Sequence, residues 1–204
     1  MRFAFAGDRD LAVECLEFLL ERGDRPEVLL LAGPKRASHA DRLAALCAPF
    51  LPPERILRGT WFRGPKGQAF LRELDLDLAL SVHFPYIVPP EVLAMPARGF
   101  LNLHPAYLPY NRGWHTPTWA LLEDTPIGAT FHVMDDGVDT GDILAQRALQ
   151  PTLGDTANTL YAKLKALEVE LFREAWPALV EDQLHRQPQD PDAGTSHVKA
   201  DLFT

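Results

Sequence analysis

The chain has 204 residues, of which 47% are hydrophobic and 24% charged, and its formal net charge at pH 7 is −8. This length and composition fit one large globular domain, or one domain with a short appendage, with enough apolar residues for a buried core. The excess of acidic over basic residues gives no positively charged surface for binding nucleic acid or an anionic membrane, so neither is expected as a partner.

No apolar run in the sequence approaches the length of a membrane span, and no basic-then-apolar leader precedes the first apolar segment. The sequence therefore predicts a cytoplasmic, soluble protein. Cys15 and Cys47 lie far apart in apolar surroundings, which favours two reduced core thiols over a disulfide or a metal pair. The seven histidines are scattered without ligand spacing, so no metal site is predicted.

The first part of the chain alternates predicted strands with predicted helices. A short buried strand in "RFAFAG" is followed by a turn at Gly7 and an amphipathic helix that ends at Gly23. A second strand, "EVLLLAG", precedes a helix in "ASHADRLAALCAPF", for which Ser38 is the expected N-cap. A weak third strand near residues 55–57, a helix in "GPKGQAFLRELD" and a strand in "LDLALSVHF" come next.

The second part continues this alternation. "VPPEVLAMP" predicts a short helix with an early proline, "GFLNLH" a strand, and "TPTWALLED" a helix capped by Thr116 or the residue before it. Two strands, "IGATFHVM" and "DILAQRAL", precede a long helix in residues 155–182, whose apolar residues recur at spacings of three and four. We expect a catalytic domain at residues 1–182 and a polar, Pro-rich tail or small appendage at residues 183–204.

This alternation predicts an α/β fold, namely a Rossmann-like, mostly parallel central sheet with helices on both faces. Such sheets bind ligands at the carboxyl ends of their strands. Nucleotide-binding signals are weak, because "FAGDRDLA" has one glycine where a dinucleotide fingerprint needs three. Lys35 and Arg36 are interpreted as part of a solvated loop rather than a phosphate cradle.

Two segments carry candidate catalytic side chains. Asn102 and His104 are two residues apart at the end of a predicted strand, so their side chains project from the same face. A lone histidine beside a proline is more often structural, but an acidic loop, "HVMDDGVDTGD", follows another buried strand. One of its carboxylates, brought to His104, would fix the tautomer of the ring and raise its pKa by charge pairing. The carboxylates of this loop are Asp135, Asp136, Asp139 and Asp142, and a solvated turn is the alternative for Asp135, Asp136 and Asp142.

The order and spacing of residues in "NLHPAYLPYNRG" and "IGATFHVMDDGVDTGDILAQ" resemble the signature of the formyltransferase family that uses 10-formyltetrahydrofolate. That family includes glycinamide ribonucleotide transformylase, methionyl-tRNA formyltransferase and the nucleotide-sugar N-formyltransferases. The resemblance is strong over residues 77–150 and looser elsewhere, and it implies the formyltransferase fold, N10-formyltetrahydrofolate as formyl donor and no metal. The residues that fit are Asn102, His104, Pro105, Leu108, Pro109, Gly113, His132, Asp139 and Gly141.

The resemblance assigns catalysis to Asn102, His104 and Asp139. An amine would attack the formyl carbon, and Asn102 and a protonated His104 would donate hydrogen bonds to the developing oxyanion. Asp139 would keep His104 charged and, through water, take up or relay the proton that leaves the amine. His132 is given a structural role, with orientation of Asp139 or of the folate loop as the alternative.

The resemblance also implies two binding surfaces. The segment "FPYIVPPEVL" would bind the pterin of the folate through Phe84, Tyr86, Ile87 and Val88, which match the family in apolar character rather than in residue identity. The segment "MDDGVD" would close the pterin pocket from the other side with Asp135, Asp136 and Gly137. Ordinary core packing is the alternative for Phe84 and Ile87. The acceptor side would be lined by Tyr110, Asn111, Arg112 and Trp114, where a ring can stack on a sugar or base and Arg112 can bind a diphosphate. A rigid surface loop is the alternative for these four.

The acceptor is expected to be a small-molecule amine, and a homodimer is possible. "LPYNRG", "DTGDIL" and the last helix are similar to the nucleotide-sugar enzymes, which makes a nucleotide-linked amino sugar the first choice and other small amines the second. Glycinamide ribonucleotide is third, because those enzymes usually carry a Gly-Ser-Asn phosphate grip where this chain has "GDRDLA". Methionyl-tRNA is disfavoured by the acidic charge and by the absence of that enzyme's C-terminal domain. A 10-formyltetrahydrofolate hydrolase and a non-enzymatic folate-binding protein remain as alternatives of other classes.

Overall fold

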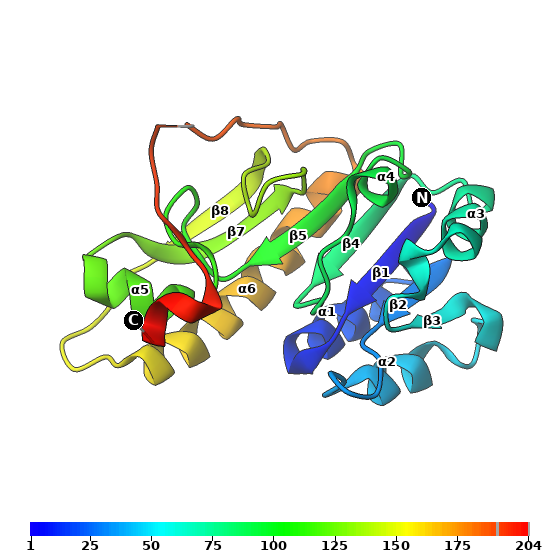
Figure 1. Ribbon diagram of the computed structural model, residues 1–204, viewed down its shortest axis with the longest axis horizontal. Coiled ribbons are helices and arrows are strands. Elements are labelled where there is room, and N and C mark those ends of the chain that lie inside the picture. Colours follow the sequence, from blue (N-terminus) through cyan, green and yellow to red (C-terminus); the bar gives the residue numbers. More distant parts are fainter. Residues whose placement is uncertain (191, 204) are drawn as a thin grey trace. The chain divides into compact units, whose positions relative to one another are not determined.

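Figure 1 shows the computed structural model, which describes residues 1–190 and 192–203. The chain divides into two compact units, Met1–Asn102 and Leu103–Thr204. Strand β5 (Phe100–His104) crosses this boundary, so that its first three residues belong to unit 1 and its last two to unit 2.

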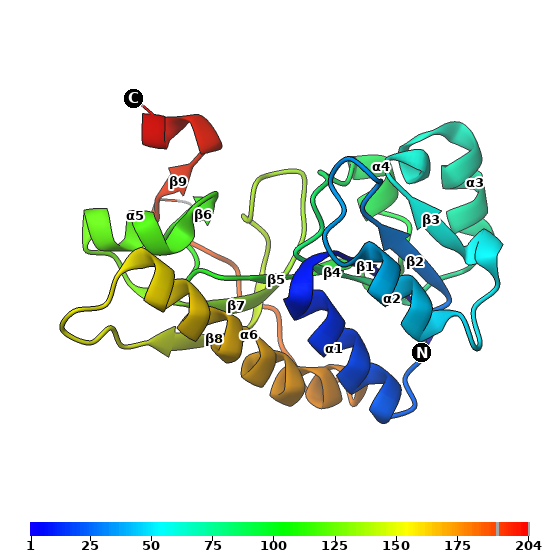
Figure 2. The same ribbon diagram turned by 90° about the horizontal axis from the view of Figure 1, so that it is seen from below.

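Unit 1 is a parallel sheet with helices on both faces. Its strands follow the order β3-β2-β1-β4-β5, and the pairs β1–β2, β1–β4 and β2–β3 are all parallel. Figure 2 shows α1 and α2 on one side of these strands and α3 and α4 on the other. The strands are β1 (Phe3–Gly7), β2 (Val28–Leu31), β3 (Ile56–Arg58) and β4 (Leu78–Val82). The helices are α1 (Arg9–Glu21), α2 (Ala40–Cys47), η1 (Pro53–Arg55), η2 (Trp61–Arg63), α3 (Pro65–Glu73) and α4 (Pro90–Leu93).

The central strands of unit 1 are buried along their whole length. Every residue of β1, β2 and β4 is buried, which is why their sequences are apolar almost throughout, with Ser81 as the polar exception, instead of alternating. Proline occupies the first turn of α3 and of α4, where its missing N–H costs no helical hydrogen bond. The expected mostly parallel α/β fold is confirmed.

The start of α2 differs from the expectation. The N-cap residue is His39, which makes no capping bond with its side chain, and the hydroxyl of the predicted cap, Ser38, lies 2.8 Å from Nδ1 of His39. The buried carboxylate of Asp8, which follows β1, accepts hydrogen bonds from the backbone N–H of Ser38 at 3.0 Å and of His39 at 2.8 Å. A residue distant in sequence therefore satisfies these amides, which a local capping pattern cannot reveal.

Unit 2 contains the carboxyl end of β5 and an antiparallel pair. β7 and β8 pair antiparallel, and the strand order in this unit is β5-β7-β8. Helix α6 packs against both β7 and β8 (Figure 2). The strands are β6 (Arg112–Gly113), β7 (Ile127–Val133), β8 (Ile143–Leu149) and β9 (Ser196–His197). The helices are α5 (Thr116–Glu123), α6 (Ala157–Val180) and η3 (Lys199–Phe203).

Helix α6 begins with a reciprocal cap. Thr156 accepts from the backbone N–H of Thr159, and the Thr159 hydroxyl accepts from the backbone N–H of Thr156 at 2.8 Å. A stripe of apolar side chains then recurs at helical spacing and is buried against the strands. It consists of Leu160, Leu164, Leu167, Leu171, Phe172, Ala175, Trp176 and Leu179.

The segment after α6 returns to the strands of unit 2. Gln187 and Ile143 form an antiparallel bridge, and β9 pairs in parallel with β6 (Figure 1, the orange and red segment). Among residues 1–190 and 192–203, no helix combines the length and apolar character that crossing a bilayer would require.

Candidate active site

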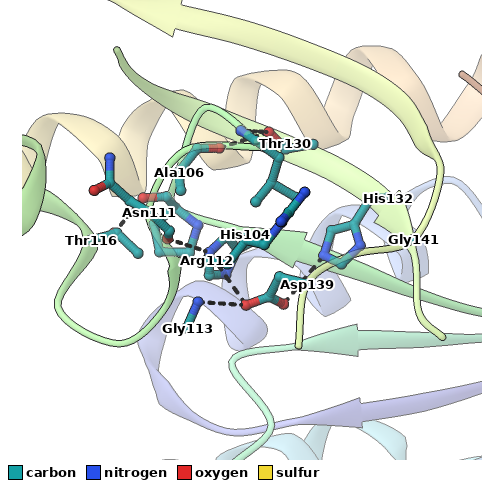
Figure 3. A network of polar contacts seen from close by, with 12 residues as sticks. His104, Ala106, Asn111, Arg112, Gly113, Thr116, Thr130, His132, Asp139 and Gly141 are labelled. Carbon is teal, nitrogen blue, oxygen red and sulfur yellow. Dashed lines mark hydrogen bonds and ion pairs between the residues drawn. The ribbon is translucent and has the colours of Figure 1, made fainter. Parts of the chain in front are cut away.

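His104 ends strand β5 with its ring almost fully buried, at 6% relative exposure. Its Nε2 atom lies 3.5 Å from Oδ2 of Asp139 and 3.4 Å from the backbone oxygen of Asn111 (Figure 3). The structure therefore brings together the histidine and the carboxylate that the sequence pattern paired, although 35 positions of chain separate 104 from 139.

Asp139 is held by three parts of unit 2. Its Oδ2 accepts a hydrogen bond from the backbone N–H of Gly113 at 3.0 Å, in addition to the contact with His104. Its Oδ1 lies 3.5 Å from Nε2 of His132, which comes from β7 (Figure 3). Asp139 itself adopts a left-handed backbone conformation, with φ of 54°, in the loop between β7 and β8. Such a conformation is uncommon for a residue other than glycine and is tolerated here within a tightly bonded loop.

His132 contacts an acceptor with each of its ring nitrogens. Nδ1 lies 2.8 Å from the backbone oxygen of Val133, and Nε2 faces the Asp139 carboxylate. A register shift in the β7–β8 pairing occurs between Phe131 and His132, as is common beside functional sites. The placement supports the alternative role considered for His132, which is to orient Asp139.

The electrostatics of the pair differ from the expectation. Burial lowers the pKa of His104 below its ordinary value, and the nearby Asp139 charge, which raises it, does not fully compensate. Asp139 does act to raise the pKa of His104, as expected, but the expected net increase is not met, because desolvation of the ring outweighs the carboxylate. For Asp139, burial acts to raise the pKa, but His104, His132 and the Gly113 N–H together hold it well below the usual range. The resting pair is accordingly a carboxylate beside an imidazole that is neutral at neutral pH.

Asn102 precedes His104 by two residues on β5, so the two side chains leave the same face of the strand. Asn102 is partly exposed, whereas both of its neighbours in the strand are buried. Its amide is thus not enclosed in the core.

The acidic loop after β7 is ordered by its own side chains. Oδ1 of Asp135 accepts from the backbone N–H of Gly137 at 3.2 Å and from the hydroxyl of Thr140 at 2.6 Å. Asp136, Gly137 and Val138 are exposed at the tip of this loop. The loop therefore has a defined turn with a solvent-facing tip.

The four residues proposed for the acceptor have different environments. Trp114 is 56% exposed, and Tyr110 and Arg112 are partly exposed. Asn111 is only 1% exposed, and its side-chain amide donates to the hydroxyl of Thr125 at 2.8 Å. The expectation that the Asn111 side chain lines the acceptor surface is therefore not met, because this side chain is buried and bonded inside unit 2.

The loop after β4 in unit 1 carries the residues proposed for the pterin. Ile87 is 81% exposed, whereas Val88 is 4% exposed and belongs to the core. Tyr86 packs edge-on against Phe84, and its hydroxyl accepts from the backbone N–H of Gly33 at 3.0 Å. Guanidinium groups fix two carbonyls of the loop, since Arg36 donates to Pro85 at 2.8 Å and Arg63 donates to Ile87 at 2.6 Å.

Sequence reasoning missed two contributors to the site. The backbone N–H of Gly113 binds the Asp139 carboxylate, although Gly113 was noted only as part of a pattern. Gln189, from the segment assigned to a tail, donates to the backbone oxygen of Asp139 at 2.9 Å. Nothing in the local sequence around Gln189 signals this contact. Among the residues that the structure describes, no cluster of three or more His, Cys, Asp or Glu side chains could hold a metal ion.

Comparisons with known proteins agree on one family. A family model described as formyl transferase matches residues 50–176. A methionyl-tRNA formyltransferase of Myxococcus xanthus is 32% identical over 192 residues, which cover 92% of this chain and 61% of that protein. The chain thus spans about three fifths of the length of this relative.

The solved structures that are similar to the chain include two formyltransferases. The formyltransferase PseJ from Anoxybacillus kamchatkensis, determined with UDP-4,6-dideoxy-4-formamido-L-AltNAc and tetrahydrofolate, is 32% identical with a TM-score of 0.65, covering 85% of this chain and 87% of that one. A sugar N-formyltransferase from Shewanella has a TM-score of 0.80 at 20% identity, covering 98% of this chain and 78% of that one, and this likeness concerns the fold.

Proposed function

Because this chain belongs to the formyl transferase family, we propose that it transfers a formyl group from N10-formyltetrahydrofolate to a primary amine. The observation that carries this proposal is the buried contact of 3.5 Å between His104 and Asp139 at the carboxyl end of β5. A neutral imidazole beside a fixed carboxylate is an arrangement suited to moving a proton during acyl transfer.

His104 is the proposed proton carrier. The formyl donor supplies the activated carbonyl carbon, and the neutral ring of His104 takes a proton from the amine as the new carbon–nitrogen bond forms. Asp139 stabilises the imidazolium that results, which a buried ring would otherwise disfavour. The same proton then passes to the folate nitrogen as its bond to the formyl carbon breaks, so His104 ends the cycle neutral.

Asn102 is the proposed oxyanion donor. Its side-chain amide shares a strand face with His104 and can donate to the formyl oxygen while negative charge builds on it. Loss of one such donor costs about 10²–10³ in rate in other acyl-transfer enzymes.

The loop after β4 is the proposed contact for the pterin. Ile87 presents a large apolar side chain to solvent, and the carbonyls at positions 85 and 87 are already held by arginines. An exposed apolar side chain on a fixed backbone fits a flat heteroaromatic ring, with Phe84 and Tyr86 supporting the loop from behind. Within this proposal, Val88 acts only as a core anchor. The turn formed by Asp135, Asp136 and Gly137 is the proposed second contact.

A nucleotide-linked amino sugar is the proposed acceptor. Trp114 offers an exposed ring for stacking, and Arg112 offers charge for a diphosphate. The 32% identity to a structure determined with a formylated UDP-sugar supports the same choice.

Methionyl-tRNA is the second candidate, and it rests on the sequence relatives named above. The net charge of −8 argues against it, since binding a polyanion requires clustered cationic side chains.

The test is a screen for formyl transfer with N10-formyltetrahydrofolate and three acceptors, namely nucleotide-linked amino sugars, glycinamide ribonucleotide and methionyl-tRNA. Mass spectrometry would detect the gain of one formyl group on the acceptor. The proposal expects turnover with an amino sugar and none without an amine. Rapid deformylation of the folate without any amine would instead support a hydrolase, and tight folate binding with no turnover on any acceptor would support a binding protein.

A further inference from the structure

The segment after α6 crosses the site of unit 2 and is bonded to it at three places. We call residues 187–190 and 192–198 the strap. Its first attachment is to β8, where Gln187 and Ile143 exchange two backbone hydrogen bonds, each of 2.8 Å. The second is the side chain of Gln189, and the third is the stretch from Thr195 to His197, which pairs with β6.

Gln189 uses all of its hydrogen-bonding capacity on two loops. Its amide nitrogen donates to the backbone oxygen of Asp139 at 2.9 Å and to that of Gly141 at 2.7 Å. Its amide oxygen accepts from Arg112 twice, from Nε at 3.2 Å and from Nη2 at 2.9 Å. A side-chain amide has two donors and two acceptor positions, so these four bonds saturate it. One side chain thus links the loop that carries Asp139 to the loop that carries Arg112.

The third attachment fixes the backbone on both sides of Gly113. The N–H of Arg112 donates to the Thr195 oxygen at 2.9 Å, and the N–H of Trp114 donates to the His197 oxygen at 3.0 Å. The intervening Gly113 N–H points to the other side and binds Asp139 (Figure 3). A side chain on Gly113 would meet the His197 oxygen at 2.3 Å, so strap and loop are in close contact there.

From these contacts we propose that Gln189 is a positioning residue, through which the strap holds the Asp139 carboxylate in line with His104 and holds Arg112 toward the acceptor side. The kinetic part of this proposal rests on the proposed function, whereas its structural part does not. The Asp139 carboxylate is set from two directions, by Gln189 on its own backbone and by Gly113 on its side chain, and both depend on the strap.

Two substitutions at position 189 test this role. Gln189→Met keeps the side-chain volume but removes all four hydrogen bonds. Gln189→Glu keeps an acceptor for Arg112 but places a carboxylate oxygen, which cannot donate, opposite the backbone oxygens of Asp139 and Gly141. Since a misplacement of about 1 Å can cost about 10²-fold in rate, we expect kcat to fall about 10–100-fold in both variants. Gln187→Ala is the matched control, because Gln187 is exposed and holds Ile143 through its backbone. This control is expected to keep the wild-type kcat.

A readout that needs no turnover separates this proposal from the proposed function. Displacing the Asp139 charge removes what raises the pKa of His104, so the NMR titration of the His104 ring should move to lower pH in Gln189→Met, which adds no charge of its own. Hydrogen exchange of the Gly113 amide should also become faster. If both signals match the wild type in folded variants, the strap proposal is wrong, whatever the enzyme's activity. If both change while no acceptor is ever formylated, the proposed function fails and the strap role stands.

A variant distant from the carboxylate tests the strap as a unit. Gly194 has φ of +100°, and a Cβ there would meet the Pro109 oxygen at 2.1 Å, so Gly194→Ala should push the strap away from the loop. Gly154→Ala is matched, because Gly154 has φ of +94° with nothing within 4 Å. We expect faster exchange at Gly113 in Gly194→Ala alone. Equal exchange rates in the two variants would contradict the proposal.

Discussion

At the scale of single residues, the charge of Asp139 and the burial of His104 act in opposite directions on the same proton. Burial removes water from the imidazole and favours its neutral form, while the carboxylate at 3.5 Å favours the cation. The ring is therefore neutral at rest, and in the proposed mechanism it becomes charged when it takes a proton from the amine.

The first prediction concerns Asp139→Asn. Removing the charge leaves the imidazolium unsupported, so kcat should fall by about 10²–10⁴-fold. If His104 acts as a base, kcat of the wild type rises with pH as the ring loses its proton. In Asp139→Asn the pKa of His104 falls further, so this acidic limb should move to lower pH. A pH–rate profile measures both effects, and a limb that moved to higher pH would contradict the assignment.

The second prediction concerns stability. The folded pKa of His104 lies below its ordinary value of 6.5, so the unfolded chain binds this proton more readily and the unfolding free energy falls as pH drops below about 6.5. The pKa of Asp139 is also lowered, so its stabilisation is present above its ordinary pKa of 3.8 and is lost only under more acidic conditions. A tenfold difference in proton affinity corresponds to about 1.4 kcal/mol.

His104→Gln isolates the first of these contributions. Thermal unfolding at pH 7.5 and pH 5 should give a smaller loss of Tm in this variant than in the wild type. An equal loss in the two proteins would mean that His104 is not the group responsible.

The meeting of His104 with a carboxylate of the acidic loop could be predicted from sequence, but the environments of these residues could not. The pattern selected Asn102, His104 and Asp139, and the structure places the last two in contact. The expected net increase in the pKa of His104 is not met, because desolvation depends on the packed surroundings and leaves no mark in the local sequence. The burial of Asn111 likewise depends on Thr125, which lies 14 residues away.

At the scale of elements, helix α6 is the clearest case in which the nearby sequence determines where an element begins and which face it buries. The capping pair Thr156 and Thr159 satisfies the amides of its first turn, and its apolar stripe packs on β7 and β8. We predict that Thr156→Ala lowers the unfolding free energy by about 1 kcal/mol through loss of the cap. Asn158→Ala, an exposed change in the same turn, is the control and should stay within about 0.5 kcal/mol of the wild type in a urea titration. Equal effects of the two changes would argue against the cap.

The regular elements followed the hydrophobic pattern, and the irregular ones did not. Long periodic segments and continuous apolar runs predicted α6 and the strands of unit 1, because burial alone determines those patterns. β6 and β9 have two residues each and no periodicity, so only their pairing with each other defines them as strands. The bonds of Gln189 to Asp139 and Gly141 span about fifty positions of sequence, and no local signal marks them.

At the scale of the whole molecule, the net charge of −8 bears on the choice of acceptor. A protein that neutralises six to ten phosphates loses about 10³–10⁵ in affinity between 50 and 200 mM salt. For a nucleotide-linked amine we predict a loss in kcat/KM of less than about tenfold over that range, because only a diphosphate is contacted. Steady-state kinetics at both salt concentrations measure this, and a drop of thousands would favour a nucleic-acid acceptor.

The family and the fold class predicted from the sequence are confirmed at this scale. Spaced polar residues in a fixed order identify a family well, because each position is required for a separate geometric reason. The identity of the acceptor cannot be predicted in the same way, since it depends on the surface of short loops whose conformation is set by residues distant in sequence, such as those of the strap.

The carboxylate of Asp8, described above at the start of α2, occupies the amides of Ser38 and His39 from inside the protein. Peptide amides at such a turn would otherwise attract a phosphate ester from solution. Because the Asp8 carboxylate is tethered to the chain, its effective local concentration at these amides is about millimolar or higher, and a dissolved phosphate must compete with it. The negative charge of Asp8 also repels a phosphate at short range. This chain has therefore closed one docking point that a small phosphorylated metabolite could use, and an acceptor must be recognised by other groups.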